Sequence, residues 1–180
     1  DGTVVTMADQ RWNTYIDCGG LDTIISASKD NGKTWEYTYA NYLGDNGDVY
    51  EGDFVDGKKN GKGKYTSFDG SYYEGEFKDD LRHGKGKLVT SDGGVYEGEF
   101  EKGVKSGQGK YSYPNGDIYE GGFLGDLRHG EGKYVWANGE TYTGEFANGN
   151  MNGYGIYTWP TGRASYTGYF KDGVIVVVED

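Results

Sequence analysis

The sequence contains very little proline and cysteine, and it lacks an excess of basic residues. Only 2 of its 180 residues are proline, which excludes a collagen-like chain or a proline-rich linker despite 34 glycines. Cys18 is the single cysteine, so no internal disulfide can form. Cysteine usage therefore does not indicate whether the protein resides in an oxidising or a reducing compartment. Lysine and arginine total 18 against 29 acidic residues, a net charge of −11. Because phosphate groups need a basic surface, no nucleic acid partner and no strong electrostatic binding to anionic membranes are expected.

The sequence also lacks a long hydrophobic run. No segment approaches the roughly 20 apolar residues of a membrane span. No signal peptide is visible, but the chain begins at Asp1 rather than at methionine, so this absence leaves the localisation unknown. Aromatic residues, in contrast, make up 16% of the chain, with 18 tyrosines. They supply apolar area for a core, so an ordered fold is expected rather than disorder.

A pentapeptide of the form Tyr-x-Gly-x-Phe recurs at a fixed period. Its copies begin at Tyr50, Tyr73, Tyr96, Tyr119, Tyr142 and Tyr166, spaced by 23 residues four times and then by 24. Each of the first five copies is followed by a Gly-x-Gly run, as at Gly84 and Gly86. A fixed period of this length indicates a stacked array, in which each unit buries its apolar face on its neighbours.

Within one unit the pattern alternates with a period of two. Tyr73 and Phe77 share one face with Gly75, while the glutamates between them take the other face. The segment KDDLRHG, residues 78–84, is predicted to be a polar turn, followed by a return strand with glycines inside and lysines outside. The sequence therefore predicts an all-β protein of antiparallel hairpins, whose glycines let aromatic rings pack over bare backbone.

This pattern closely resembles the MORN repeat family. The resemblance covers about residues 48–173, with five full repeats and a partial sixth. It implies an elongated, twisted antiparallel sheet of stacked β-hairpins. It also implies a scaffold that contacts proteins or lipids.

Several segments that look like catalytic or metal sites are better explained by the repeat. Glu74 and Glu76 lie about 6.6–7 Å apart along one strand, a spacing that suits an inverting glycosidase, but the pair recurs in phase and faces lysines on the return strand. Opposite charges across strands are structural. His83 and His129 lie two repeats apart, roughly 19 Å, too far to share a metal. No metal and no cofactor are expected.

One position varies along the array in an informative way. Two residues after the return-strand aromatic stand Ser67, Thr90, Tyr113, Trp136 and Trp159. The last three form an aromatic ladder with a step of about 9.6 Å, which occurs only in the C-terminal half. Such a ladder either extends the core or, if it lies at the strand ends, forms an apolar binding strip. Tyr113, Trp136 and Trp159 are therefore the candidate binding residues.

The first 47 residues lack the repeat. They alternate like strands, and the segment from Ser28 to Trp35 places Asp30, Asn31 and Gly32 in a turn. This segment resembles the bacterial sialidase family: Ser28–Trp35 matches its Asp-box, and Asp9 in ADQRW matches its acid/base aspartate. The arginine cluster and the tyrosine–glutamate pair that sialidases need are absent, and 47 residues make about one propeller blade. No catalytic residue is expected, and Asp9 is interpreted as inactive in this chain.

Three parts follow from these patterns. Residues 1–47 form a sialidase-like β segment that caps the array, residues 48–173 form the MORN array, and residues 174–180 form a C-terminal capping strand. The run Val174–Val178 is apolar on both faces, so it either caps the last repeat or pairs two copies end to end. The cap, and with it a monomer, is favoured.

The predicted function is a non-enzymatic scaffold that binds a protein, with lipid or glycan left open as partners. The alternative is a sialidase-derived module, a fragment or insert of a glycoside hydrolase that acts on or binds sialoglycans. The localisation follows the same division: bacterial secretion or the cell surface if the sialidase resemblance reflects the parent protein, otherwise the cytoplasm or a membrane surface.

Overall fold

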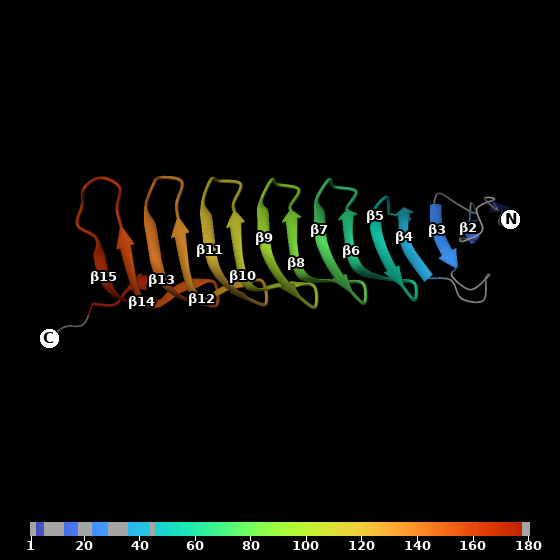
Figure 1. Ribbon diagram of the computed structural model, residues 1–180. Coiled ribbons are helices and arrows are strands. Elements are labelled where there is room, and N and C mark those ends of the chain that lie inside the picture. Colours follow the sequence, from blue (N-terminus) through green and yellow to red (C-terminus); the bar gives the residue numbers. More distant parts are fainter. Residues whose placement is uncertain (1–2, 6–12, 18–22, 29–35, 44–45, 178–180) are drawn as a thin grey trace. The chain divides into compact units, whose positions relative to one another are not determined.

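The computed structural model describes residues 3–5, 13–17, 23–28, 36–43 and 46–177, the last range with its side chains. These residues form strands and turns and no helix, so the predicted all-β class is confirmed (Figure 1). The chain divides into two compact units, Asp1–Ser91 (unit 1) and Asp92–Asp180 (unit 2). The three-part division at residues 47 and 173 stays a prediction.

Consecutive strands pair antiparallel within each unit. Unit 1 contains β1 (Thr3–Val5), β2 (Asn13–Asp17), β3 (Thr23–Ser28), β4 (Glu36–Leu43), β5 (Val49–Val55), β6 (Lys58–Thr66), β7 (Tyr72–Lys78) and β8 (Leu81–Val89). Unit 2 contains β9 (Val95–Glu101), β10 (Val104–Ser112), β11 (Ile118–Leu124), β12 (Leu127–Val135), β13 (Thr141–Ala147), β14 (Asn150–Thr158), β15 (Tyr166–Lys171) and β16 (Val174–Ile175). Each unit is thus a meander of hairpins.

The register confirms the predicted alternation of faces. Glu74 of β7 lies opposite Lys64 of β6 and Lys87 of β8, so carboxylates and ammonium groups alternate across the strands. Gly75 lies opposite both Gly63 and Gly86, so three bare backbones stand side by side. The glycine row and the charged row therefore take opposite faces of the sheet.

The predicted seven-residue turn was wrong. The turn between β7 and β8 is only Asp79 and Asp80, whose φ angles of 49° and 69° are both left-handed. Two such residues make a type I′ turn, the connection that best fits the twist of a two-residue hairpin. His83 consequently lies in β8 and His129 in β12, in strands rather than in turns.

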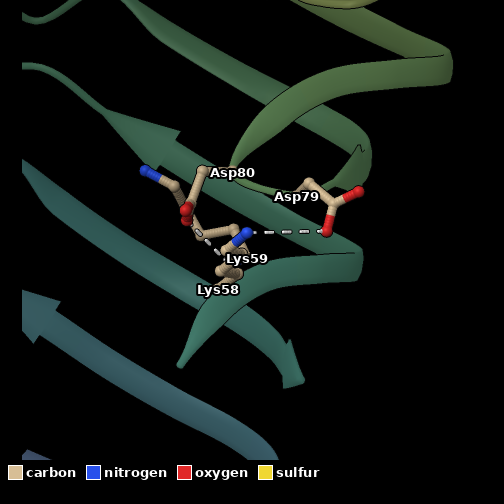
Figure 2. Close-up of polar contacts among 4 residues, drawn as sticks. All are labelled: Lys58, Lys59, Asp79 and Asp80. Carbon is tan, nitrogen blue, oxygen red and sulfur yellow. Dashed lines mark hydrogen bonds and ion pairs between the residues drawn. The ribbon is translucent and has the colours of Figure 1, made fainter. Parts of the chain in front are cut away.

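Neighbouring turns in unit 1 are bonded to each other (Figure 2). The Asp80 carboxylate accepts the backbone N–H of Lys59 at 2.9 Å, and the Asp80 N–H donates to the carbonyl of Lys59 at 3.0 Å. Lys58 Nζ lies 4.0 Å from Asp79 Oδ1, an exposed pair of small energetic value. These bonds connect residues 21 positions apart and so fix one hairpin on the next.

The paired acids have a structural role that alternation alone does not predict. A register shift interrupts the pairing of β7 and β8 next to Glu76, where Gly84 adopts a φ of +56°. The Glu76 carboxylate accepts the N–H of Lys85 at 3.1 Å, just after this bulge. Asp53 and Glu145 accept the corresponding amides in their own repeats. In these three repeats, the acid directly before the phenylalanine therefore stabilises a β-bulge.

The core is a row of tyrosine and phenylalanine rings. The tyrosines that begin the repeats are almost fully buried: Tyr50, Tyr73, Tyr96, Tyr119 and Tyr142. Tyr119 packs edge-on against Phe123 of its own repeat at 5.1 Å and against Phe146 of the next at 4.9 Å. Its hydroxyl donates to the carbonyl of Gly122 at 2.9 Å, so the buried polar group is satisfied. Aromatic contacts within and between repeats thus provide the core.

The two ends of the array continue its pairing. β4 pairs with β5 through Tyr42 and Tyr50, the same register in which Tyr65 opposes Tyr73. At the other end β16 folds back on β15, and Val176 N–H donates to the carbonyl of Tyr169 at 2.9 Å. The capping roles of residues 1–47 and 174–180, and the dimer through Val174–Val178, stay predictions because Val178 and much of the N-terminal segment lie outside the described residues.

Candidate binding surface

The part of the chain that the structure describes contains no candidate metal centre. Across ranges 3–5, 13–17, 23–28, 36–43 and 46–177, no group of three histidine, cysteine or acidic side chains is placed to hold a metal ion. In the same ranges, no helix has the length and apolar character needed to cross a membrane. Asp9 and the Asp-box residues 29–35 lie outside the described part of the chain, so their interpretation as a sialidase-like element stays a prediction.

The charged face of unit 1 forms an open hollow. It is lined by acidic and basic side chains from the four consecutive strands β5 to β8. These side chains are Glu51, Asp53, Lys62, Lys64, Glu74, Glu76 and Lys85. Because acids and bases alternate there, the hollow concentrates charge of neither sign. It therefore lacks the field that would select a strongly charged ligand.

Unit 2 carries a continuous row of six aromatic rings. We call this set the aromatic row; it consists of Tyr111, Tyr113, Tyr134, Trp136, Tyr157 and Trp159. Successive ring centroids lie 4.2, 5.8, 4.6, 5.2 and 4.8 Å apart, with interplanar angles of 38° to 50°. All three predicted binding residues belong to the row. Each lies one residue beyond the end of its strand and pairs with the tyrosine two positions before it.

Tight turns hold Tyr113 and Trp136 at the ends of their strands. Tyr113 donates its N–H to the carbonyl of Asp117 at 2.9 Å and accepts the N–H of Gly116 at 3.0 Å. Pro114 and Asn115 between them are typical central residues of a type I turn, and Gly116 supplies the left-handed φ of +90°. Trp136 closes its own turn with the same two bonds. Backbone bonds thus fix where the rings leave the sheet.

Asp117 anchors the middle of the row. The Tyr134 hydroxyl donates to Asp117 Oδ2 at 2.6 Å, and Ala137 N–H donates to Oδ1 at 2.8 Å. Burial by itself would raise the pKa of Asp117, but the hydrogen bonds from Tyr134, Ala137 and Asn115 outweigh it and hold that pKa below its usual value. Burial and this carboxylate together raise the pKa of Tyr134. Hydrogen bonds to Asp117 therefore fix the return strand of one repeat to the turn of the preceding repeat.

Glu140 repeats this arrangement one repeat later. The Tyr157 hydroxyl donates to Glu140 Oε2 at 2.9 Å, and Asn138 Nδ2 donates to the same oxygen at 3.0 Å. Burial, followed by the Glu140 carboxylate, raises the pKa of Tyr157 to about 12. Two of the six rings are thus held by an acid from the preceding loop.

Cations lie beside the row in each repeat. Lys105 Nζ lies 4.8 Å from the Tyr111 ring centre, and the Arg128 guanidinium lies 4.8 Å from that of Tyr134. Arg128 also donates from Nε to the carbonyl of Gly149 at 3.0 Å. At the far end the exposed Arg163 stacks on Trp159 at 4.3 Å. These cation–π contacts add to the order of the rings.

The row is neither core nor free surface. Tyr134 is 8% exposed and Asp117 is 7% exposed, whereas the other five rings are partly exposed. Tyr113, Trp136 and Trp159 were predicted from the sequence. Tyr111, Tyr134 and Tyr157 were not, because a return-strand tyrosine also stands at Tyr65 and so does not mark the C-terminal half of the array. The acids were not predicted either. An acid two residues before the repeat tyrosine, as in DNGD, PNGD and ANGE, was the available signal.

Comparisons with known proteins agree with this architecture. A family model described as MORN repeat matches residues 50–72, 73–95, 96–118, 119–141 and 142–162. The partial sixth repeat, predicted from Tyr166, lies beyond these matches. No curated protein matches the chain.

Among solved structures, the chain is similar to the SAS-4 (dCPAP) TCP domain of Drosophila melanogaster, solved in complex with a Proline Rich Motif of Ana2 (dSTIL). The TM-score is 0.50 at 16% identity, over 94% of this chain and 90% of the other. At that identity the likeness concerns the fold alone.

Proposed function

The chain belongs to the MORN repeat family, whose repeats fit a scaffold role in protein or membrane interaction, and on that premise we propose that it is a non-enzymatic scaffold that binds a protein partner through the aromatic row. The observation that carries the proposal is the row itself: six contiguous rings of unit 2, five of them partly exposed. Tyrosine and tryptophan dominate binding energy at protein interfaces because they bury large areas at low entropic cost.

The similar solved structure supports a peptide-like partner. The SAS-4 TCP domain binds a Proline Rich Motif of another protein, so a sheet of this fold can serve as a platform for a peptide. Lipid and glycan stay open as partners from the sequence, but the net charge of −11 does not favour an anionic bilayer. The sialidase-derived alternative depends on residues 1–47, and no contact among the described residues adds to it.

The proposal predicts that truncating the row weakens binding more than folding. Trp136→Ala and Trp159→Ala remove partly exposed rings, so each should reduce recovery of the partner in a quantitative pull-down by about tenfold or more, which corresponds to losing one interface hot spot. The melting temperature should change little.

The matched control is Tyr154→Ala, which removes an aromatic ring of the opposite face that is 50% exposed. It should leave the pull-down unchanged. If both tryptophan variants instead lose the roughly 3–5 kcal/mol typical of a buried aromatic truncation, the row is core and the proposal fails.

A further inference from the structure

The spacing of the aromatic row sets a condition on the partner. Each repeat adds two strands, and strands lie about 4.8 Å apart, so the ring pairs Tyr111/Tyr113, Tyr134/Trp136 and Tyr157/Trp159 recur about every 9.6 Å across the strands. A segment that lies along the row must present an equivalent side chain at that same interval. Only some backbone conformations do so.

A polyproline II helix meets the condition. It has three residues per turn and rises about 3.1 Å per residue, so the same face returns about every 9.3 Å. The mismatch with the array is about 0.3 Å per repeat, or about 0.6 Å over the two steps of the row. Residues i, i+3 and i+6 would therefore lie over three successive ring pairs.

Other conformations fit less well. An extended β segment advances about three residues in the same distance, and because its side chains alternate with a period of two, successive contacts would point to opposite sides. An α-helix returns to the same face after about seven residues, roughly 10.5 Å, so its misfit reaches about 1.8 Å over two repeats. The array therefore selects a three-residue repeat.

The chemistry of the row agrees with its geometry. Successive rings are tilted by 38° to 50°, so they do not stack flat on each other. Surfaces lined by aromatic rings are the ones on which proline-rich segments dock. A polyproline II segment leaves all its backbone carbonyls unpaired, and Trp136 and Trp159 carry indole N–H donors. The conformation is also largely preformed, which reduces the entropic cost of binding.

From these observations we propose that the aromatic row binds a proline-rich segment in the polyproline II conformation, laid across the strands with one proline over each ring pair. The inference rests on the proposed function and adds the conformation, the period and the minimum length. Three ring pairs require prolines at positions i, i+3 and i+6, a segment of seven residues.

The test is a selection of twelve-residue random peptides displayed on phage against the full chain, with Trp136→Ala and Tyr154→Ala selected in parallel. Peptides retained by the wild type and by Tyr154→Ala but lost with Trp136→Ala bind the row. We expect these peptides to share prolines three residues apart. Circular dichroism of each variant checks that its sheet is intact, and Trp159→Ala, which shortens the row by one ring, provides a second truncation.

Two synthetic peptides then measure the period directly. Both contain three prolines and nine glutamines; one places the prolines at i, i+3 and i+6, the other at i, i+4 and i+8. Fluorescence polarisation with the full chain should give a dissociation constant about tenfold lower for the first peptide. Trp159→Ala should remove most of this difference, because only two full ring pairs remain.

The outcomes separate the inference from the proposed function. Equal binding of the two synthetic peptides, or no binding by either, overturns the inference. Selected peptides that depend on Trp136 but show no three-residue period, or show a seven-residue one, also overturn it while leaving the proposed function intact. If no selected peptide depends on Trp136 or Trp159, the proposed function fails, and the inference fails with it.

Discussion

At the scale of single residues, Asp117 holds the middle of the aromatic row in place. Its carboxylate accepts hydrogen bonds from the Tyr134 hydroxyl, the Ala137 amide and the Asn115 side chain, and it is only 7% exposed. A nearly buried carboxylate is tolerated because these donors replace water. These hydrogen bonds favour the ionised carboxylate of Asp117 over the protonated form. The order of the row therefore depends on pH.

This arrangement predicts acid sensitivity with a definite sign. The hydrogen bonds hold the pKa of Asp117 below its usual value in the fold, so the stability that they confer is present at neutral pH and is lost as the pH falls through the folded pKa. Asp117→Asn should lower the free energy of unfolding at neutral pH by roughly 1.5–3 kcal/mol, the range for bonds to a charged group. The loss of stability on acidification should become smaller.

Urea unfolding at neutral and acidic pH measures both effects, with the exposed Glu131→Gln as the control that should change neither. If Asp117→Asn and the wild type lose the same stability on acidification, Asp117 is not the group responsible.

At the scale of elements, much of the hairpin could be predicted from the sequence. Two features, the turn and the bulge, could not be predicted, and each failure has a physical reason. The alternation of Tyr73, Gly75 and Phe77 gave the strand and its inner face correctly. The turn was missed because Asp79–Asp80 lacks the glycine that normally marks a type I′ turn, and both aspartates adopt left-handed φ angles without it. The bulge at Gly84 was missed because a register shift leaves no trace in a period-two pattern.

The close approach of strands and rings predicts a steric role for the second glycine of each Gly-x-Gly run. A Cβ on Gly109 would lie 2.5 Å from the Tyr96 ring and hydroxyl, and the backbone φ at this position is not left-handed. Gly109→Ala should therefore cost about 1–3 kcal/mol through overpacking rather than backbone strain. Thermal unfolding checks this, with the neighbouring exposed Lys110→Ala as the control. An unchanged melting temperature for Gly109→Ala would mean that the sheet can shift to make room.

At the scale of the whole molecule, the candidate site was predicted in part. Tyr113, Trp136 and Trp159 stand out because Ser67 and Thr90 occupy the same position in earlier repeats, and this variation along an otherwise regular array is visible in the sequence. Their partners in the row were not visible, since a tyrosine of the return strand has the same sequence signature whether it is buried or partly exposed. Cross-repeat bonds, such as the one from Tyr134 to Asp117, join residues 17 positions apart and need the three-dimensional register.

The repeated core predicts how the chain responds to alkali. Burial, as the largest cause, raises the pKa of Tyr73, Tyr119 and Tyr142 to about 12 and also raises that of Tyr50 and Tyr96. A tyrosine of the unfolded chain ionises near pH 10. Because the folded pKa values are higher, the stability that depends on neutral hydroxyls is fully present below about pH 10 and is lost as the pH rises from about 10 to about 12. Unfolding in that window should release several protons together.

The measurement follows tyrosinate absorbance and far-ultraviolet circular dichroism in one alkaline titration. We expect a group of tyrosines to ionise only as the sheet signal disappears. Tyr119→Phe removes one of these protons and one hydrogen bond to Gly122, so it should lower the neutral stability by about 1 kcal/mol and reduce the pH dependence of the alkaline transition. If all tyrosines instead ionise near pH 10 while the sheet signal is unchanged, the buried hydroxyls are accessible to base, and the repeated tyrosines do not couple the stability of the array to pH.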